Sequence, residues 1–144
     1  MQSNIAVLLP YKDQFIKDNA GSASIWVKDF SKDSKLKKNT TIFGYTSNVS
    51  KTFDNFNYVN LKFSNFGVQS KNLKYVNKFI DVLNRKKFSL IEIHNRPSYI
   101  LHIEKNLPNQ KYILVIHNNP QTLRGAVTPK ERKHLIKLCS KITF

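Results

Sequence analysis

The chain has 144 residues, of which 40% are hydrophobic, and this is enough for one domain with a substantial apolar core. Its single cysteine excludes an internal disulfide and a cysteine-based zinc site. The 24 lysines and arginines against 9 aspartates and glutamates give a net charge of +15, which favours polyanionic partners such as nucleic acid, anionic lipid or phosphorylated small molecules. Because lysine and asparagine dominate the polar residues, compositional drift of the genome explains the charge equally well.

The N-terminal half is predicted to alternate strands and a helix. Residues 4–9 form an apolar strand, and a helix follows from Ser22 or Ser24, either of which can cap it, to about residue 38. Two further strands are predicted, at 40–45 and, within a polar and asparagine-rich stretch, near 57–61. Three apolar side chains of the helix are expected to face the core: Ile25, Trp26 and Phe30.

The C-terminal half repeats the alternation. The clearest helix is 70–87, and strands at 89–93 and 110–116 flank a short helix at 97–107. The last helix is predicted to start at the capping box Thr128-Pro129-Lys130-Glu131, and residues 141–144 begin another strand. The helix at 70–87 carries one apolar stripe at helical spacing: Leu73, Val76, Ile80 and Leu83.

Strands separated by helices imply right-handed crossovers and a parallel sheet with helices on both faces. The predicted fold class is therefore α/β, a Rossmann-like three-layer sandwich with a mostly parallel sheet, and residues 1–144 are expected to form a single domain. Because the last predicted strand begins at the very end of the chain, we expect the chain to be one half of a longer protein.

The sequence favours a cytoplasmic protein. Its longest apolar runs, 5–9 and 112–116, are much shorter than the roughly 20 residues of a transmembrane helix. The N-terminus has no basic stretch before its apolar run, so it does not resemble a signal peptide.

Ligands of open parallel sheets bind beyond the carboxyl ends of the strands, and a loop of small residues follows the first predicted strand there. Asn19-Ala20-Gly21-Ser22-Ala23-Ser24 runs into a helix, whose free N–H groups favour a phosphate or another anionic oxygen. A tight loop with a serine cap explains the same residues without any ligand.

Two other predicted strands end in related motifs, His94-Asn95-Arg96-Pro97 and His117-Asn118-Asn119-Pro120. Equivalent places at neighbouring strand ends should face the same crevice, where histidine and asparagine can bind sugar hydroxyls or phosphate. The alternative is that each histidine satisfies backbone groups at its own strand end. Zinc is not expected, because no third ligand of the usual type has suitable spacing.

Basic residues add two further predictions. Arg96 and Arg124 lie in these strand-end loops and suit the recognition of phosphate or carboxylate, although surface solvation explains them too. The last helix is expected to present a basic face to an anionic membrane, or simply to solvent: Lys130, Lys133, Lys137 and Lys141.

Taken together, these motifs make the chain resemble the N-terminal domain of glycosyltransferase family 4, whose enzymes have the GT-B fold. The resemblance covers the whole chain and is most specific over 91–144, with its two His-Asn-x-Pro strand ends, Thr-Leu-Arg-Gly and the Thr-Pro-Lys-Glu-Arg helix. It is closest to members that build lipopolysaccharide and related cell-surface glycans. The family's small-residue loop usually contains Gly-Gly, whereas Ala20-Gly21-Ser22-Ala23 has one of these glycines.

The resemblance implies the acceptor-binding half of a retaining glycosyltransferase that uses a nucleotide-sugar donor and a glycan or lipid-linked acceptor. It implies that His117 lies near the transferred sugar, that Gly21 and Ser22 contact the donor, and that no metal or other cofactor is required. The acceptor side would be lined by His94, Asn95, Arg96, Asn118 and Arg124.

The same resemblance implies a separate donor-binding half that residues 1–144 do not include, so the isolated chain should show little or no transfer. It would work in the cytoplasm, at the inner face of the plasma membrane. One alternative is a stand-alone module that binds nucleotide or nucleic acid, but the chain lacks the alternating basic and aromatic residues typical of single-strand binders. Another is a different α/β enzyme, such as a phosphatase or hydrolase.

Overall fold

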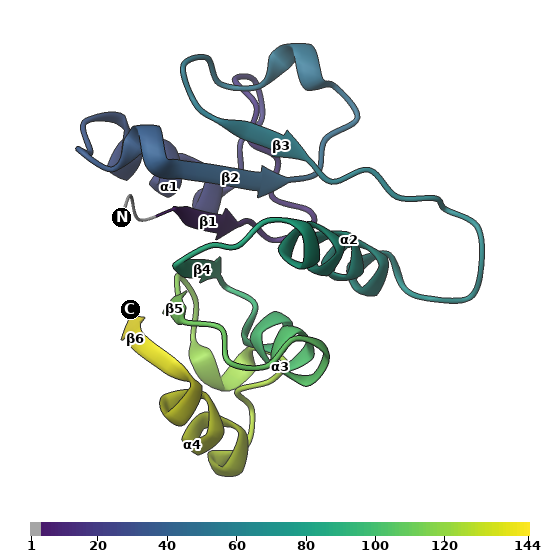
Figure 1. Ribbon diagram of the computed structural model, residues 1–144, viewed down its shortest axis with the longest axis vertical. Helices are drawn as coiled ribbons and strands as arrows, with labels where there is room; N and C mark the ends of the chain where they lie inside the picture. The colour runs from purple at the N-terminus through teal and green to yellow at the C-terminus, as the bar shows by residue number, and fades with distance from the viewer. Residues whose placement is uncertain (1–3) are drawn as a thin grey trace.

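A six-stranded, all-parallel sheet organises the molecule, and the computed structural model describes residues 4–144 (Figure 1). The strand order is β3-β2-β1-β4-β5-β6, so the chain builds outward from β1 in one direction and then from β4 in the other. The strands are β1 (Ile5–Leu8), β2 (Thr40–Gly44), β3 (Tyr58–Asn60), β4 (Leu90–His94), β5 (Tyr112–Val115) and β6 (Cys139–Thr143).

Helices cover both faces of this sheet. One face packs on α1, and the other packs on α2, α3 and α4; Figure 1 shows α2 and α3 beside one another and α4 next to β6. The predicted Rossmann-like three-layer sandwich is therefore confirmed. The helices are α1 (Ser22–Lys32), α2 (Lys71–Arg85), α3 (Pro97–Asn106) and α4 (Pro129–Leu138), with 3₁₀ turns η1 (Lys37–Asn39), η2 (Val49–Lys51) and η3 (Pro120–Thr122).

Two apolar cores hold the layers together. The larger lies between the sheet and α2, α3 and α4, with Phe79, Ile100 and Leu114 completely buried. The smaller lies under α1, where Val27 packs against Leu9 and Phe15. Central strands buried on both faces explain the continuous apolar runs of β1 and β5.

The capping prediction for α4 is confirmed, and α2 is capped as well. The Ser70 hydroxyl accepts a hydrogen bond from the N–H of Leu73 at 3.2 Å. At α4, the hydroxyl of Thr128 accepts from the N–H of Glu131, and the Glu131 carboxylate accepts from the N–H of Thr128. Both ends of this reciprocal cap are local in sequence, which is why it can be predicted.

The prediction for α1 is wrong in two respects. The helix ends at Lys32 rather than near residue 38, because the hydroxyl of Ser34 accepts a hydrogen bond from the N–H of Leu36 and this local bond competes with helix continuation. The side chains of Ile25 and Phe30 are 45% and 68% exposed, whereas Val27 is buried in the core. Trp26, the third residue expected to face the core, is partly buried and packs against the smaller core. The helix is therefore turned so that Ile25 and Phe30, but not Trp26, point away from the sheet.

Candidate functional site

The candidate site lies at the carboxyl edge of the sheet, between β1 and β4. The chain leaves β1 toward α1 on one face, and it leaves β4 toward α3 on the other face. Two neighbouring strands whose connections depart in opposite directions leave a crevice between them, where ligands bind in open α/β sheets.

Two histidines meet at this edge of the sheet, at the carboxyl ends of β4 and β5, as the sequence predicts. His94 ends β4 and is completely buried, and His117, two residues after β5, is partly exposed. The Nδ1 atom of His94 lies 2.9 Å from Nε2 of His117, and the two rings stack with centroids 5.2 Å apart. Trp26 of α1 closes the other side, with its ring centroid 5.2 Å from that of His94 and 5.8 Å from that of His117.

Glu92 completes the cluster, and the sequence analysis missed it. Its Oε1 atom lies 2.7 Å from Nε2 of His94. The signal was present, because residues two apart in a strand project from the same face and therefore place Glu92 beside His94.

The asparagines of the two motifs differ in what they do. Asn95 is buried and has a positive φ of 53°, and its Oδ1 accepts a hydrogen bond of 2.8 Å from the N–H of His117. Asn95 therefore ties the two strand ends together, and its Oδ1 is already engaged, although the residue was predicted to bind the acceptor substrate. Asn118, which directly follows His117, is exposed.

The electrostatics of the crevice favour a neutral His117. Burial and the neighbouring His94 ring hold its pKa below the usual histidine value, while the carboxylates of Asp13 and Glu92 oppose this. A neutral imidazole has one N–H donor and one acceptor nitrogen, which suits hydrogen bonding to a sugar hydroxyl.

We expect the free energy of unfolding to fall as the pH drops below about 6.5, the ordinary histidine pKa. The pKa of His117 is lower in the folded chain than in the unfolded chain. At pH values between these two pKa values the unfolded chain binds more protons than the folded chain, so acidification lowers the free energy of unfolding. Burial and Lys105 lower the pKa of His102 and add to the effect. Urea unfolding on either side of this pH should show a weaker pH dependence for His117→Gln than for wild type. An equal pH dependence in the two proteins would contradict the prediction.

The loop of small residues meets an acidic side chain. The Asp13 carboxylate accepts hydrogen bonds from the N–H groups of Ala23 and Ser24, at 2.9 and 3.1 Å, and thus caps α1. The expected serine cap is wrong, since the capping position is Gly21 and no side chain of that residue takes part. A Cβ at Gly21 would collide with the Asp13 carboxylate. A donor phosphate at Gly21 and Ser22 remains a prediction, and it would have to share these amides with Asp13 or displace it.

Removing this cap should measurably destabilise the chain. Asp13→Ala is expected to lower the free energy of unfolding by about 1–2 kcal/mol, the size of a lost N-cap, because two amides of α1 lose their acceptor. Asp33→Ala, which removes an exposed carboxylate at the other end of α1, serves as the matched control and should change little. Equal losses of the free energy of unfolding in the two variants, measured by urea unfolding, would contradict the prediction. They would mean that the hydrogen bonds of Asp13 to α1 stabilise the chain no more than an exposed carboxylate does.

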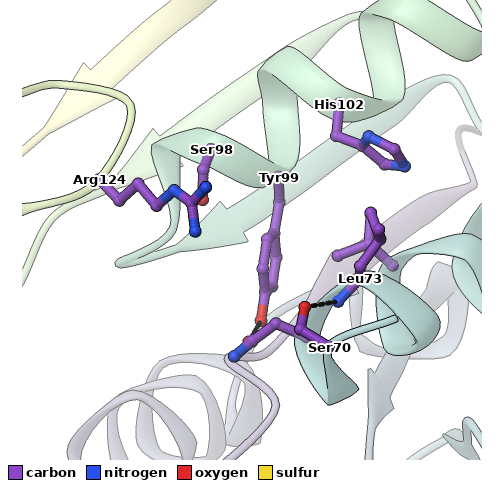
Figure 2. A pocket seen from close by; sticks show the side chains of 8 residues that line it. Ser70, Leu73, Ser98, Tyr99, His102 and Arg124 are labelled. Atoms are coloured by element: carbon purple, nitrogen blue, oxygen red, sulfur yellow. Dashed lines mark hydrogen bonds between the residues drawn. The ribbon is translucent and has the colours of Figure 1, made fainter. Parts of the chain in front are cut away.

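The arginines lie elsewhere along the same edge. Arg124 lines a pocket of about 260 Å³ between α2 and α3, on the opposite face of the sheet from α1. Figure 2 shows Arg124 and Ser98 at one end of this pocket and His102 at the other, with the Tyr99 ring between them. The polar side chains around the pocket are Ser70, Asn72, Ser98, Tyr99, His102 and Arg124.

Arg96 lies between the crevice and this pocket. Its guanidinium donates a 2.9 Å hydrogen bond to the carbonyl of Asn95. Burial raises the pKa of the Tyr99 hydroxyl, whereas the hydrogen bond that it accepts from the N–H of Tyr11 and the charge of Arg96 lower it. The five residues predicted for acceptor binding thus do not share one place: His94, Asn95 and Asn118 lie at the ends of β4 and β5, Arg124 lies at the pocket, and Arg96 directly follows Asn95.

The backbone around Arg124 is tightly fixed. Its carbonyl accepts a 3.1 Å hydrogen bond from the N–H of Ser98 at the start of α3. Gly125 has a φ of 93°, and a Cβ there would lie 2.7 Å from the Ser98 nitrogen. Only glycine combines this conformation with so close an approach, so the loop that carries Arg124 is held against α3.

The predicted basic face is only partly helical. Lys130, Lys133 and Lys137 are exposed on α4, but Lys141 lies in β6, because the helix ends at Leu138 and the chain turns directly into the strand. The expectation that all four share one helix face is therefore wrong. None of the helices within residues 4–144 has the length and apolar character needed to cross a bilayer.

In the part of the chain that the structure describes, no three His, Cys, Asp or Glu side chains are grouped so that they could hold a metal ion. That no metal is required stays a prediction. No protein-family model matches the chain, and no characterised protein or solved structure matches it significantly.

Proposed function

We propose that the chain is the acceptor-binding half of a retaining glycosyltransferase, which transfers a sugar from a nucleotide-sugar donor to a cell-envelope glycan or lipid-linked acceptor. The observation that carries the proposal is the contact between His94 and His117, 2.9 Å apart at the adjoining carboxyl ends of β4 and β5, beside the point where the connections of β1 and β4 leave in opposite directions. Crevices at this point of a parallel α/β sheet are where such folds bind small ligands.

The chemistry of the crevice agrees with a sugar ligand. A partly exposed, neutral imidazole and the exposed amide of Asn118 can donate to and accept from hydroxyl groups. Beside them, the ring of Trp26 is only partly buried and stacks on Phe30 at 4.7 Å, which leaves aromatic surface next to the histidines. In this proposal His117 lies nearest the transferred sugar.

The acceptor is assigned to the edge of the sheet between the crevice and the α2–α3 pocket. Arg96 and Arg124 both lie along this edge, and a guanidinium binds carboxylate or phosphate groups of a charged glycan well. Exposed lysines on α4 would favour binding of the enzyme to an anionic membrane surface on its cytoplasmic side. The nucleotide is assigned to a second domain, as the resemblance to family 4 implies.

Sugar transfer by the complete two-domain enzyme tests the proposal. A panel of nucleotide sugars is incubated with envelope glycans, and the expected product has a new glycosidic bond with the anomeric configuration of the donor. Residues 1–144 alone should give at most trace transfer with the same panel. Inversion at the anomeric carbon, absence of transfer across the panel, or robust transfer by the isolated domain would contradict the proposal.

A further inference from the structure

Three side chains at the crevice form a hydrogen-bonded series. Glu92 and His94 both project from one face of β4, and Oε1 of Glu92 lies 2.7 Å from Nε2 of His94. On its other side the His94 ring reaches His117, with 2.9 Å between Nδ1 and Nε2. The middle member is completely buried, so both of its nitrogens are committed to these two partners.

The direction of each hydrogen bond follows from what each group can donate. A carboxylate only accepts, so His94 donates through its Nε2–H to Glu92. A neutral imidazole has a single N–H, so Nδ1 of His94 must then accept, and the donor to it is Nε2–H of His117. A neutral His117 whose proton is on Nε2 carries a lone pair on Nδ1.

That Nδ1 atom is exposed to solvent. Among residues 4–144 it forms no hydrogen bond, yet every buried side-chain nitrogen or oxygen in that part of the chain has a partner. Since His117 is only partly buried, its Nδ1 must reach solvent.

We propose that Glu92 is a positioning residue that acts through His94: it fixes His117 in the Nε2–H form, so that Nδ1 accepts a hydrogen bond from a hydroxyl group of the ligand. The assignment of that ligand as a sugar rests on the proposed function, whereas the arrangement of protons does not. Without Glu92, His94 could carry its proton on Nδ1 and donate to His117, which would reverse the polarity of the open nitrogen.

The opposite arrangement needs a cationic His94 that donates from both nitrogens and leaves His117 with its proton on Nδ1. Complete burial of the His94 ring opposes that charge. The groups that face His117 are His94 and Glu92 of β4, Asp13 of the loop after β1, and the uncharged Trp26 of α1; their combined effect with burial is a lowered His117 pKa.

Long-range proton–nitrogen NMR correlation of the ¹⁵N-labelled chain at neutral pH tests this directly, because it shows which ring nitrogen of each histidine is protonated. We expect protonated Nε2 and bare Nδ1 for both His94 and His117 in the wild type. A proton on Nδ1 of His117, or two protons on His94, would overturn the proposal, and this outcome needs no variant that has to fold.

Two substitutions extend the test. Glu92→Gln keeps an oxygen that can accept from His94, so the proton arrangement should persist while the His117 pKa falls further, because the negative charge is lost. Glu92→Leu removes the acceptor, and a substantial population of His117 with its proton on Nδ1 should appear. Glu104→Gln, which removes a carboxylate bonded to Tyr112 from the other side of the sheet, should leave the His117 pKa unchanged. An unchanged pattern in folded Glu92→Leu would overturn the role of Glu92.

Transfer measurements separate this proposal from the proposed function. In the complete enzyme, Glu92→Leu should lower turnover by about tenfold, the lower end of what losing the partner of an active histidine costs in metal sites, and Glu92→Gln should retain most of it. If the NMR pattern is as expected but no variant or wild type transfers sugar, the proposed function fails and the positioning role stands. If transfer occurs with the opposite proton arrangement, the positioning role fails alone.

Discussion

Under the proposed function, replacing His117 by alanine is expected to lower the turnover of the two-domain transferase by about 10²-fold or more, within the range that a positioned hydrogen-bonding or acid–base side chain contributes. The fold should persist, because the ring is partly exposed and the bond to Asn95 comes from the backbone N–H, which alanine retains. The measurement is the initial rate of sugar transfer at saturating donor and acceptor.

The matched control is His134→Ala, which removes the exposed histidine of α4 and should leave turnover unchanged. Circular dichroism and urea unfolding of residues 1–144 establish that both variants fold. Near-normal transfer by folded His117→Ala would remove His117 from the reaction and leave the crevice without its central residue.

Gly125→Ala is expected to lower the free energy of unfolding by about 2–4 kcal/mol. The estimate combines the strain of a positive φ with the cost of forcing an atom into packed backbone, because a new Cβ would lie 2.7 Å from the nitrogen and 2.9 Å from the Cα of Ser98. The substitution should also displace the loop that carries Arg124 into the α2–α3 pocket.

Gly67→Ala measures the cost of the positive φ alone. Gly67 has nearly the same φ, 97°, but nothing lies within 4 Å of a Cβ placed there, so its loss should be only about 1 kcal/mol. Urea unfolding of the two variants compares them directly. Equal losses would show that close packing against α3 does not hold the Arg124 loop.

Much of the fold could be predicted because its signals are local. The reciprocal cap between Thr128 and Glu131 joins residues three apart, and the apolar stripe of α2 recurs within one helix. The orientation of α1 was predicted wrongly because its large apolar side chains were expected to be the buried ones. Its largest apolar side chain, Trp26, borders the crevice, and Phe30 stacks on it largely in solvent, so these residues serve the crevice more than the core.

The part of the candidate site that lies directly at strand ends could be predicted from the sequence. Two His-Asn-x-Pro motifs after neighbouring parallel strands predict that His94 and His117 meet, and they do. Contacts between distant segments were not predictable. Asp13 lies in a loop, and nothing local indicates that its carboxylate reaches the amides of α1 and takes the position expected for an anion.

Arg124 shows a second limit. It follows the same strand as His117 and was assigned to the same group of residues, but the intervening loop crosses to α3 and carries it to the other face of the sheet. The direction in which a loop leaves a strand depends on what it packs against, here the start of α3 at Ser98. A single sequence does not contain that information in any local pattern.

The central claim is that the crevice between β1 and β4 binds sugar, and amide chemical-shift mapping of the ¹⁵N-labelled chain tests it most directly. Envelope-derived saccharides should shift the amides of 94–96, 98 and 117–118 at physiological salt, and these shifts should be lost in His117→Ala. A single-stranded oligonucleotide, added in parallel, should cause only weak changes that disappear as salt is raised, as expected for non-specific attraction to a chain of net charge +15. Tight oligonucleotide binding without any saccharide response would contradict the account and identify the chain as a nucleic-acid-binding module.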